Sequence, residues 1–417
     1  MPKTSHRRRV LVPLLLTAAS GTFAFCLGEG VLRLFFERQL GEPPANAERS
    51  SESTFWRRDE SLGWSHVVGA SGHFSNGAFN GEVHIDALGN RKNSAAGTFV
   101  LGFRNIFFLG DSTAVSLEVN DDQTVPARIE QSLRAGRLEV NVVNLGVRGY
   151  GTDQSVRKAL MLAPRVPPAD IIYMFTGNDV WDNNVLREAG RKFGKGVYWH
   201  RDGGSDFSPF NYPVPEYPDE AYGFVLFDED CRPTIHRGSW RRPERPLNTF
   251  RQLANDSLYL ARAAGLIRHA LQDPAVESID PFRMIAGAKA AMWSDDFSLA
   301  YSDAGVVRSR CTSYFDAQLR FLLGQLRAIT GLEHLYVVHF PDWAVLRSRR
   351  AGRPAPSVEA FQAMVRDRLI DGYVDLSAAL EQEGIPPLDL QCPYDIHFCD
   401  RGNRWIASHI LDSLPYR

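Results

Sequence analysis

A serine that could act as a nucleophile stands at the end of an apolar run. Residues 106–109 predict a buried strand, and the strand stops at Gly110-Asp111-Ser112, a sequence typical of a tight turn. In open α/β sheets, ligands bind beyond the carboxyl ends of the strands, so Ser112 would lie where chemistry is usually done. The alternative is that Ser112 only caps a following helix, which is the commoner use of a serine at such a place.

Three further polar motifs stand beside predicted strands or helices. Asn144-Leu145-Gly146 and Gly177-Asn178-Asp179 each follow a predicted strand, and Asp395-Ile396-His397 precedes the final helix. The first two should therefore meet Ser112 at one rim of a parallel sheet. A serine hydroxyl needs a base to take its proton, and among these motifs only His397 offers an imidazole. These residue types fit acyl transfer through a serine nucleophile, and each motif alone is a weak signal.

In this order and on these elements, the four motifs resemble the four sequence blocks of the SGNH hydrolases, also called GDSL esterases. The resemblance covers residues 105–184 and 315–417, with the longer matching strings at 144–151 and 395–403. It implies a three-layer α/β/α, flavodoxin-like fold with a parallel sheet. It also implies ester hydrolysis through a covalent acyl-enzyme that needs no cofactor and no metal.

The resemblance assigns roles to single residues. Ser112 would be the nucleophile, His397 the base, and Asp395 the acid that orients the imidazole. The backbone N–H groups of Ser112 and Gly146 and the side-chain amide of Asn178 would bind the oxyanion, where each donor is typically worth about 10²–10³ in rate. The alternative for Asn178 is a plain turn residue, since Gly-Asn-Asp is good turn chemistry.

Other residues of the motifs have lesser expected roles or depart from the family pattern. Three of them should mainly support the loops around the site: Asp111, Asn144 and Asp179. The commoner last block has an acid three residues before the histidine, where this chain has Tyr394, and Asp395 stands two before it. The orienting role of Asp395 is therefore less secure than the role of His397. The third block has Thr176 where glycine is usual.

Strand and helix patterns alternate along most of the chain after residue 105. This alternation favours βαβ units and a parallel sheet covered on both faces. We expect strands at 106–109, 140–143, 171–175, 335–338 and 373–376. We expect helices at 124–137, 153–162, 315–329, 358–369 and 402–414.

Two segments stand outside this alternation. Residues 55–104 are rich in glycine, serine and aromatic residues without a helical period, and they predict a small β appendage. The segment at about 186–310 is too long for a loop and too apolar for disorder, so we expect a cap inserted into the hydrolase domain of residues 105–417. Its aromatic stretch Tyr198 to Tyr222 would either form the core of the cap or line an acyl or sugar site.

The N-terminus predicts a membrane anchor. Basic residues at positions 3 and 7–9 precede residues 10–27, which carry no charge. We expect residues 1–38 to form a cytoplasmic basic tail and an uncleaved signal anchor, followed by a linker at 39–54. The catalytic domain would then face the periplasm or the cell surface. The alternative is a signal peptide cleaved after Ala18 or Ala19.

Composition excludes some classes of function. The 417 residues are 44% hydrophobic and 23% charged, and the formal net charge of −2 gives no reason to expect nucleic acid. Neither a zinc-binding motif nor a glycine-rich dinucleotide-binding motif is present. The expected partners are the membrane, through the N-terminal helix, and a small-molecule or polysaccharide ester as the substrate. The sequence does not indicate a protein partner.

Four cysteines follow the predicted anchor, and they allow three pairings or free thiols. Cys392 and Cys399 bracket Asp395 and His397 and are seven residues apart. A bond between them would close a small loop around two of the expected triad residues. We predict this pair, and with it Cys231 to Cys311.

The sequence thus predicts a serine ester hydrolase that acts on an extracytoplasmic acyl ester. One alternative is an O-acyltransferase that acetylates a cell-envelope polysaccharide, because transfer and hydrolysis share the acyl-enzyme. The other is a non-catalytic carbohydrate-binding or assembly protein on the same fold. The intact set of Ser112, Asn178 and His397 argues against that alternative.

Overall fold

The computed structural model describes most of residues 55–200 and 312–415, and only short pieces elsewhere. The described residues are 24–28, 55–75, 79–97, 99–184, 186, 194–200, 207–214, 223–227, 233–237, 312–341, 345–346, 349, 352, 355–392 and 397–415. Residues 24–28 are helical, and the rest of the predicted anchor and linker lies outside this set. Within the described residues, no helix is both long and apolar enough to cross a membrane.

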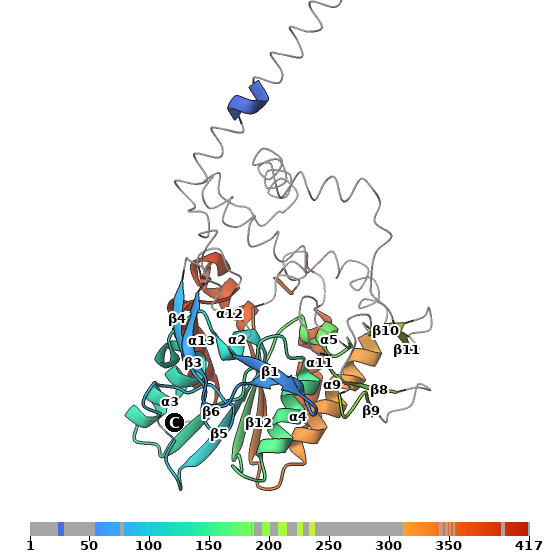
Figure 1. Cartoon of the computed structure of the whole chain (residues 1–417), viewed down its shortest axis with the longest axis horizontal. Coiled ribbons are helices and arrows are strands. Elements are labelled where there is room, and N and C mark those ends of the chain that lie inside the picture. Colours follow the sequence, from blue (N-terminus) through green and yellow to red (C-terminus); the bar gives the residue numbers. More distant parts are fainter. Residues whose placement is uncertain are drawn as a thin grey trace, which may run out of the picture. The chain divides into compact units, whose positions relative to one another are not determined.

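A five-stranded parallel sheet forms the centre of the described part of the chain (Figure 1). Its strands are β5 (Arg104–Leu109), β6 (Val140–Asn144), β7 (Asp170–Phe175), β12 (His334–His339) and β13 (Gly372–Asp375). They lie in the order β13-β12-β7-β5-β6, and all neighbouring pairs are parallel. The predicted α/β class and all five predicted strands are confirmed.

Helices cover both faces of this sheet, because its strands are apolar on both sides. The helices of one face are α4 (Thr152–Leu162), α9 (Thr312–Arg327) and α11 (Pro356–Arg366). The helices of the other face are α3 (Val125–Ala135), α12 (Leu376–Glu383) and α13 (Asp400–Ser413). Along β5, Phe107 and Leu109 join the first core, while Ile106 and Phe108 join the second. This alternation follows from the two-residue period of a strand.

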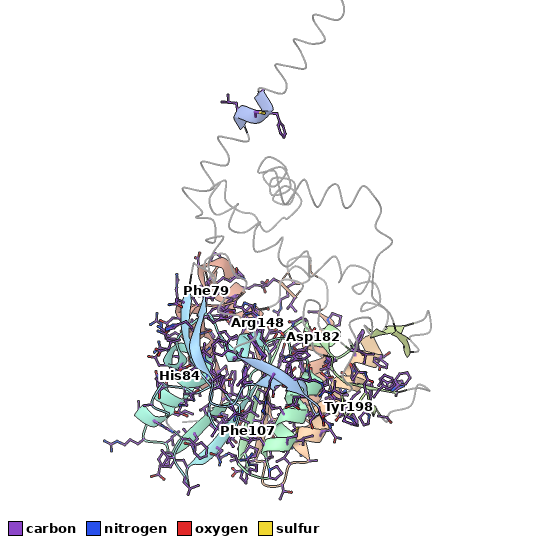
Figure 2. The ribbon with its side chains drawn as sticks, in the orientation of Figure 1. Phe79, His84, Phe107, Arg148, Asp182 and Tyr198 are labelled. Carbon is purple, nitrogen blue, oxygen red and sulfur yellow. A yellow bond between two sulfur atoms is a disulfide. The ribbon has the colours of Figure 1, made fainter. Side chains whose placement is uncertain are left out.

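The order of the strands reverses at β5, between β6 and β7. The chain leaves β5 to form β6 on one side, and then returns to form β7 on the other side of β5. In open α/β sheets, ligands bind at such a reversal of strand order. The short helices α2 (Ser112–Val115) and α5 (Asp179–Asp182) follow these two strands. Figure 2 shows Arg148 and Asp182 at the end of the sheet where Figure 1 labels α2 and α5.

Residues 55–75 and 79–97 form two antiparallel hairpins that pack against the segments after β5 and β6. The hairpins pair β1 (Trp56–Asp59) with β2 (Gly63–His66), and β3 (Ser71–Ser75) with β4 (Asn80–His84). Their buried side chains share a core with the loops that follow β5 and β6: Phe55, Trp56, Leu62, Trp64, Val83, Ile85, Val115, Leu117, Val147 and Tyr150. The indole of Trp64 also donates to the Arg148 carbonyl over 3.1 Å. These hairpins therefore contact the segments that carry site residues.

The described pieces of the expected cap include two small hairpins. They pair β8 (Val197–Trp199) with β9 (Ser208–Phe210), and β10 (Gly223–Phe227) with β11 (Pro233–Arg237). The rings of Tyr198 and Phe207 lie 5.7 and 5.5 Å from the ring of Phe321 on α9. Tyr198 and Phe207 thus pack on α9, while Trp199 contacts Phe210 within its own hairpin. The sequence of residues 247–271 also predicts a helix, and this segment lies outside the described residues.

Candidate active site

Ser112 stands at the start of α2, directly after β5, and a glycine makes that turn possible. Gly110 has φ of +148°, and a Cβ at this position would lie 2.9 Å from the carbonyl oxygen of Met174. Only glycine fits such a backbone conformation and such a close approach. Asp111 then caps α2, since its Oδ1 accepts from the N–H and the hydroxyl of Thr113 at 2.9 and 2.8 Å. The turn thereby fixes the position of the half-buried Ser112.

His397 brings its imidazole to this serine from the far end of the chain. Its Nε2 lies 2.8 Å from Ser112 Oγ, within hydrogen-bond distance. The imidazole is almost fully buried, with 9% of the side chain exposed. This is the spacing that a serine nucleophile and its general base require. The structure therefore brings together the two residues that the sequence predicted to act as a unit.

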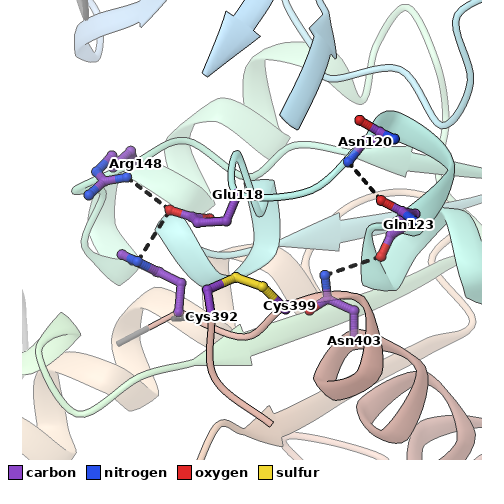
Figure 3. Close-up of a disulfide and its surroundings, with 8 residues drawn as sticks. Glu118, Asn120, Gln123, Arg148, Cys392, Cys399 and Asn403 are labelled. Atoms are coloured by element: carbon purple, nitrogen blue, oxygen red, sulfur yellow. Dashed lines mark hydrogen bonds and ion pairs between the residues drawn. A yellow bond between two sulfur atoms is a disulfide. The ribbon is translucent and has the colours of Figure 1, made fainter. Parts of the chain in front are cut away.

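A disulfide closes the loop that carries His397. Cys392 and Cys399 are bonded, with their Cα atoms 4.7 Å apart, as predicted from their spacing (Figure 3). Inside this loop the Cys392 N–H donates to the carbonyl of His397 over 2.8 Å. The disulfide and this hydrogen bond therefore join the segment before His397 to the histidine and to the residues after it. The other predicted pair, Cys231 to Cys311, lies outside the described residues.

A glutamate that the sequence motifs do not include lies on the other side of the imidazole. Glu118 Oε1 is 3.2 Å from His397 Nδ1, and its side chain is fully buried. The same oxygen accepts a hydrogen bond from Arg148 Nη1 over 3.1 Å (Figure 3). A carboxylate facing Nδ1 favours the tautomer with the proton on that nitrogen, in which Nε2 can accept from the serine.

The expected acid of the triad, Asp395, lies outside the described residues, so its role stays a prediction. Glu118 could have been noticed as the single charge in the stretch Ala114 to Val119, six residues after Ser112. A buried charge needs partners, and the partners of Glu118 come from distant parts of the chain. Nothing in the local sequence indicates that His397 and Arg148 are those partners.

Asn178 lies beside the serine, and its amide contacts two carboxylates. Its Nδ2 donates to Asp111 Oδ2 over 3.2 Å and to Asp182 Oδ2 over 2.8 Å. Asp111 Oδ2 is in turn 3.5 Å from Ser112 Oγ. The amide therefore belongs to the serine's surroundings, as predicted. To bind an oxyanion, the amide would have to give up or share one of these two hydrogen bonds. Its role as an oxyanion donor therefore remains a prediction.

Asp179 supports the turn after β7. Its Oδ2 accepts from the N–H of Thr176 over 3.1 Å and also from the Tyr173 hydroxyl. The Thr176 hydroxyl lies 3.1 Å from Asp179 Oδ1 and 3.1 Å from Asp111 Oδ2, so it joins this turn to the turn that carries Ser112. Burial, and then the charges of Asp111 and Asp182, raise the pKa of Asp179 well above its usual value. Threonine in place of the usual glycine thus adds a link between the two turns.

Asn144 and Gly146 connect the end of β6 to α2. Asn144 donates to the Ala114 carbonyl over 3.2 Å and accepts from the Gly146 N–H over 3.0 Å. A Cβ at Gly146 would lie 2.5 Å from the Val115 nitrogen, so the close packing of this loop on α2 requires glycine. The Gly146 N–H that was expected to bind an oxyanion therefore donates to Asn144 in this structure.

Comparison with known proteins adds no identification. No protein-family model matches the chain, and no curated protein matches it significantly.

Proposed function

We propose that this chain is a serine ester hydrolase of the SGNH type. The observation that carries the proposal is the 2.8 Å contact between Ser112 Oγ and His397 Nε2. A serine alone is a poor nucleophile, and an imidazole at hydrogen-bond distance is what activates it. A buried carboxylate on the opposite nitrogen, here that of Glu118, completes the set of groups that acyl transfer needs.

The proposed reaction has two steps. His397 Nε2 takes the hydroxyl proton as Ser112 Oγ attacks the ester carbonyl, and the imidazolium then gives that proton to the leaving alcohol. The first step leaves the acyl group on Ser112 through a new ester bond. In the second step His397 takes a proton from water as the water attacks the acyl-enzyme. The acid is released and the serine regains its proton.

The strand order also supports assignment to this family. The order β6-β5-β7-β12-β13 corresponds to 2-1-3-4-5 in the sequence of the sheet strands, which is the flavodoxin-like arrangement. Ser112 and Asn178 follow the two strands at the reversal point, β5 and β7, where the family resemblance expects the nucleophile and an oxyanion donor. The fold alone would not indicate this activity, but the residues at the reversal point do.

Hydrolysis is proposed in preference to transfer to a sugar. Ser112 keeps part of its surface exposed, and Tyr198 and Phe207 of the cap pack on α9. An acyl group on a serine that water can reach is lost mainly to water. The test gives the protein 4-nitrophenyl acetate with and without acetyl-accepting oligosaccharides, and quantifies free acetate and acetylated sugar. Acetylated sugar as the main product would replace hydrolysis with acyl transfer. No turnover above Ser112→Ala would leave a non-catalytic protein.

We also propose that the catalytic domain lies outside the cytoplasm, held by the N-terminal anchor. The disulfide between Cys392 and Cys399 supports this location, because such bonds persist in oxidising compartments. A reporter enzyme that is active only outside the cytoplasm, fused after Arg417, would be silent if the domain remained inside.

A further inference from the structure

We propose that Glu118 is the positioning residue that orients His397, and that Arg148 and the N-terminal hairpins hold it in place. This inference rests on the proposed function, because orienting the imidazole has a consequence only if His397 acts as a base. The acid implied by the family resemblance stands on the histidine loop itself. Glu118 would orient the imidazole in the same way from the segment between α2 and α3.

The carboxylate of Glu118 makes its described contacts through one oxygen. Oε1 lies 3.2 Å from His397 Nδ1 and 3.1 Å from Arg148 Nη1. Oε2 is buried and has no hydrogen-bond partner among the described residues. A fully buried carboxylate is costly unless it is paired, and these two partners are what the structure provides. The carboxylate is therefore held where it can stabilise an imidazolium.

Arg91 ties together the backbone around Glu118. Its Nη1 donates to the carbonyls of Val115 and Ser116, and its Nη2 donates to the Val119 carbonyl over 2.6 Å. Its Nε bonds Asp121 Oδ1 over 3.2 Å, and Nη2 also reaches the Glu82 carbonyl over 3.2 Å. All five N–H groups of this buried guanidinium are used, and most of them hold the loop that carries Glu118.

The hairpin β3–β4 contacts Arg148 and the backbone next to Glu118. A Cβ at Gly81 in β4 would lie 2.3 Å from the Leu117 carbonyl oxygen, so the strand packs directly on the loop backbone next to Glu118. The Arg148 guanidinium lies over the ring of Phe74 in β3, 5.3 Å from its centroid. The hairpin thus fixes the carboxylate through the backbone and the arginine through a cation–π contact. It acts as part of the site.

The charges that face His397 come from several elements. Glu118 lies on the Nδ1 side, with Arg148 behind it. On the Nε2 side, Asp111 approaches the serine hydroxyl at 3.5 Å, and Asp182 lies farther away through Asn178. Asp395, on the histidine loop, lies outside the described residues. Glu118 and Arg148 have opposite charges, so removing one or the other should move the titration of the imidazole in opposite directions.

The experiment measures kcat/KM for 4-nitrophenyl acetate against pH in wild type, Glu118→Gln and Arg148→Gln. Glu118→Gln should lower kcat/KM by about 10²–10⁴, as expected when the imidazole loses its orienting carboxylate. The acid limb should move to lower pH by about one unit, because the imidazolium loses an anionic neighbour. Glu118→Asp should restore part of the rate. Arg148→Gln should move the acid limb to higher pH, because the carboxylate is then left to the imidazolium alone.

Glu130→Gln is the matched control. Glu130 is also a buried carboxylate, with 5% of its side chain exposed, and it pairs with Arg134 as Glu118 pairs with Arg148. Its side chain accepts from the amide of Asn93 over 3.1 Å and from the Val142 N–H over 2.7 Å. The control variant should lose stability while it keeps the wild-type acid limb. If the change in activity came only from lost stability, it would appear in both glutamate variants.

The outcomes separate this inference from the proposed function. A wild type that neither turns over the ester nor depends on Ser112 defeats the proposed function, and the role of Glu118 falls with it. A wild type that turns over, with Glu118→Gln sharing its acid limb and rate, defeats the role of Glu118 alone. If Glu118→Gln does not fold, Arg148→Gln decides, and an unmoved acid limb in that variant overturns the inference. Asp395→Asn, measured in parallel, shows whether a second acid contributes.

Discussion

The hydroxyl of Ser112 and the imidazole of His397 lie 2.8 Å apart, although 285 positions separate them in the sequence. In the proposed mechanism the imidazole activates the hydroxyl, so the two residues should behave as one unit. Ser112→Ala, His397→Ala and the double variant should therefore lose similar amounts of kcat. Steady-state kinetics of all three against the same ester measure this. Losses that multiply in the double variant would mean that the residues act independently.

Asn178→Ala should lower kcat by about 10²–10³ if the amide binds the oxyanion. The variant removes the donor that lies between Asp111 and Asp182, so a stability loss of about 1 kcal/mol is also expected. Asn184→Ala is the control, because the buried amide of Asn184 bonds the Val180 carbonyl over 2.8 Å and Gln318 over 3.1 Å. The control should lose stability and keep its turnover. Equal turnover in both variants would reduce Asn178 to a turn residue.

Opening the disulfide at Cys392 and Cys399 should affect activity more than folding. The bond closes a loop with a sequence separation of 7, and for such a short loop the stabilisation is about 2–3 kcal/mol. Small displacements of a catalytic group can cost about 10²-fold in rate, and His397 lies inside this loop. The double variant Cys392→Ala, Cys399→Ala should lose about 10–100-fold in kcat/KM. Urea unfolding of the same variant measures its free energy of unfolding. A variant that loses stability but keeps its kcat/KM would contradict this prediction.

Lys158 should make the protein more stable as the pH rises above neutral. Burial lowers its pKa to about 7, opposed in part by the charges of Asp86 and Asp59. In the unfolded chain its pKa is about 10.4. Between these two values the unfolded chain binds a proton that the folded chain has lost, so the free energy of unfolding increases with pH in this window.

Lys158→Met should flatten that increase, because the titrating group is gone. The measurement is the free energy of unfolding in urea at about pH 7, 8 and 9. Lys92→Met is the control, since the Lys92 ammonium is exposed and makes one 3.5 Å contact, to the Ala95 carbonyl. The control should keep the wild-type slope. The same slope in Lys158→Met would show that other groups cause the pH dependence.

The sheet could be predicted from the sequence because each strand carries its own signal. Short apolar runs bounded by turn residues, such as 171–175, identify buried strands without knowledge of their neighbours. The strand β7 extends from Asp170 to Phe175, one residue longer than predicted. Thr124, the first residue of the helix expected at 124–137, caps α3, and its hydroxyl accepts from the Ala127 N–H over 3.2 Å. Local chemistry was sufficient for these elements.

Contacts between distant segments could not be read in this way. Glu118 contacts His397 only because the loop after β5 folds toward the loop before α13. The Gly146 N–H was expected at the oxyanion from the motif alone, but the motif does not reveal that Asn144 accepts from it. In both cases a side chain's partner depends on the tertiary fold. Ser112 and His397 were found because the family resemblance already contains that pairing.

Labelling with a serine-directed phosphonate tests the central claim most directly. A fluorophosphonate forms a bond between Ser112 Oγ and phosphorus and releases fluoride, so intact mass and peptide mapping report the modified residue without knowledge of the natural ester. We predict one adduct per chain, located on Ser112, absent from Ser112→Ala and slowed by several orders of magnitude in His397→Ala. No adduct, an adduct on another residue, or labelling at the wild-type rate in His397→Ala would contradict the account.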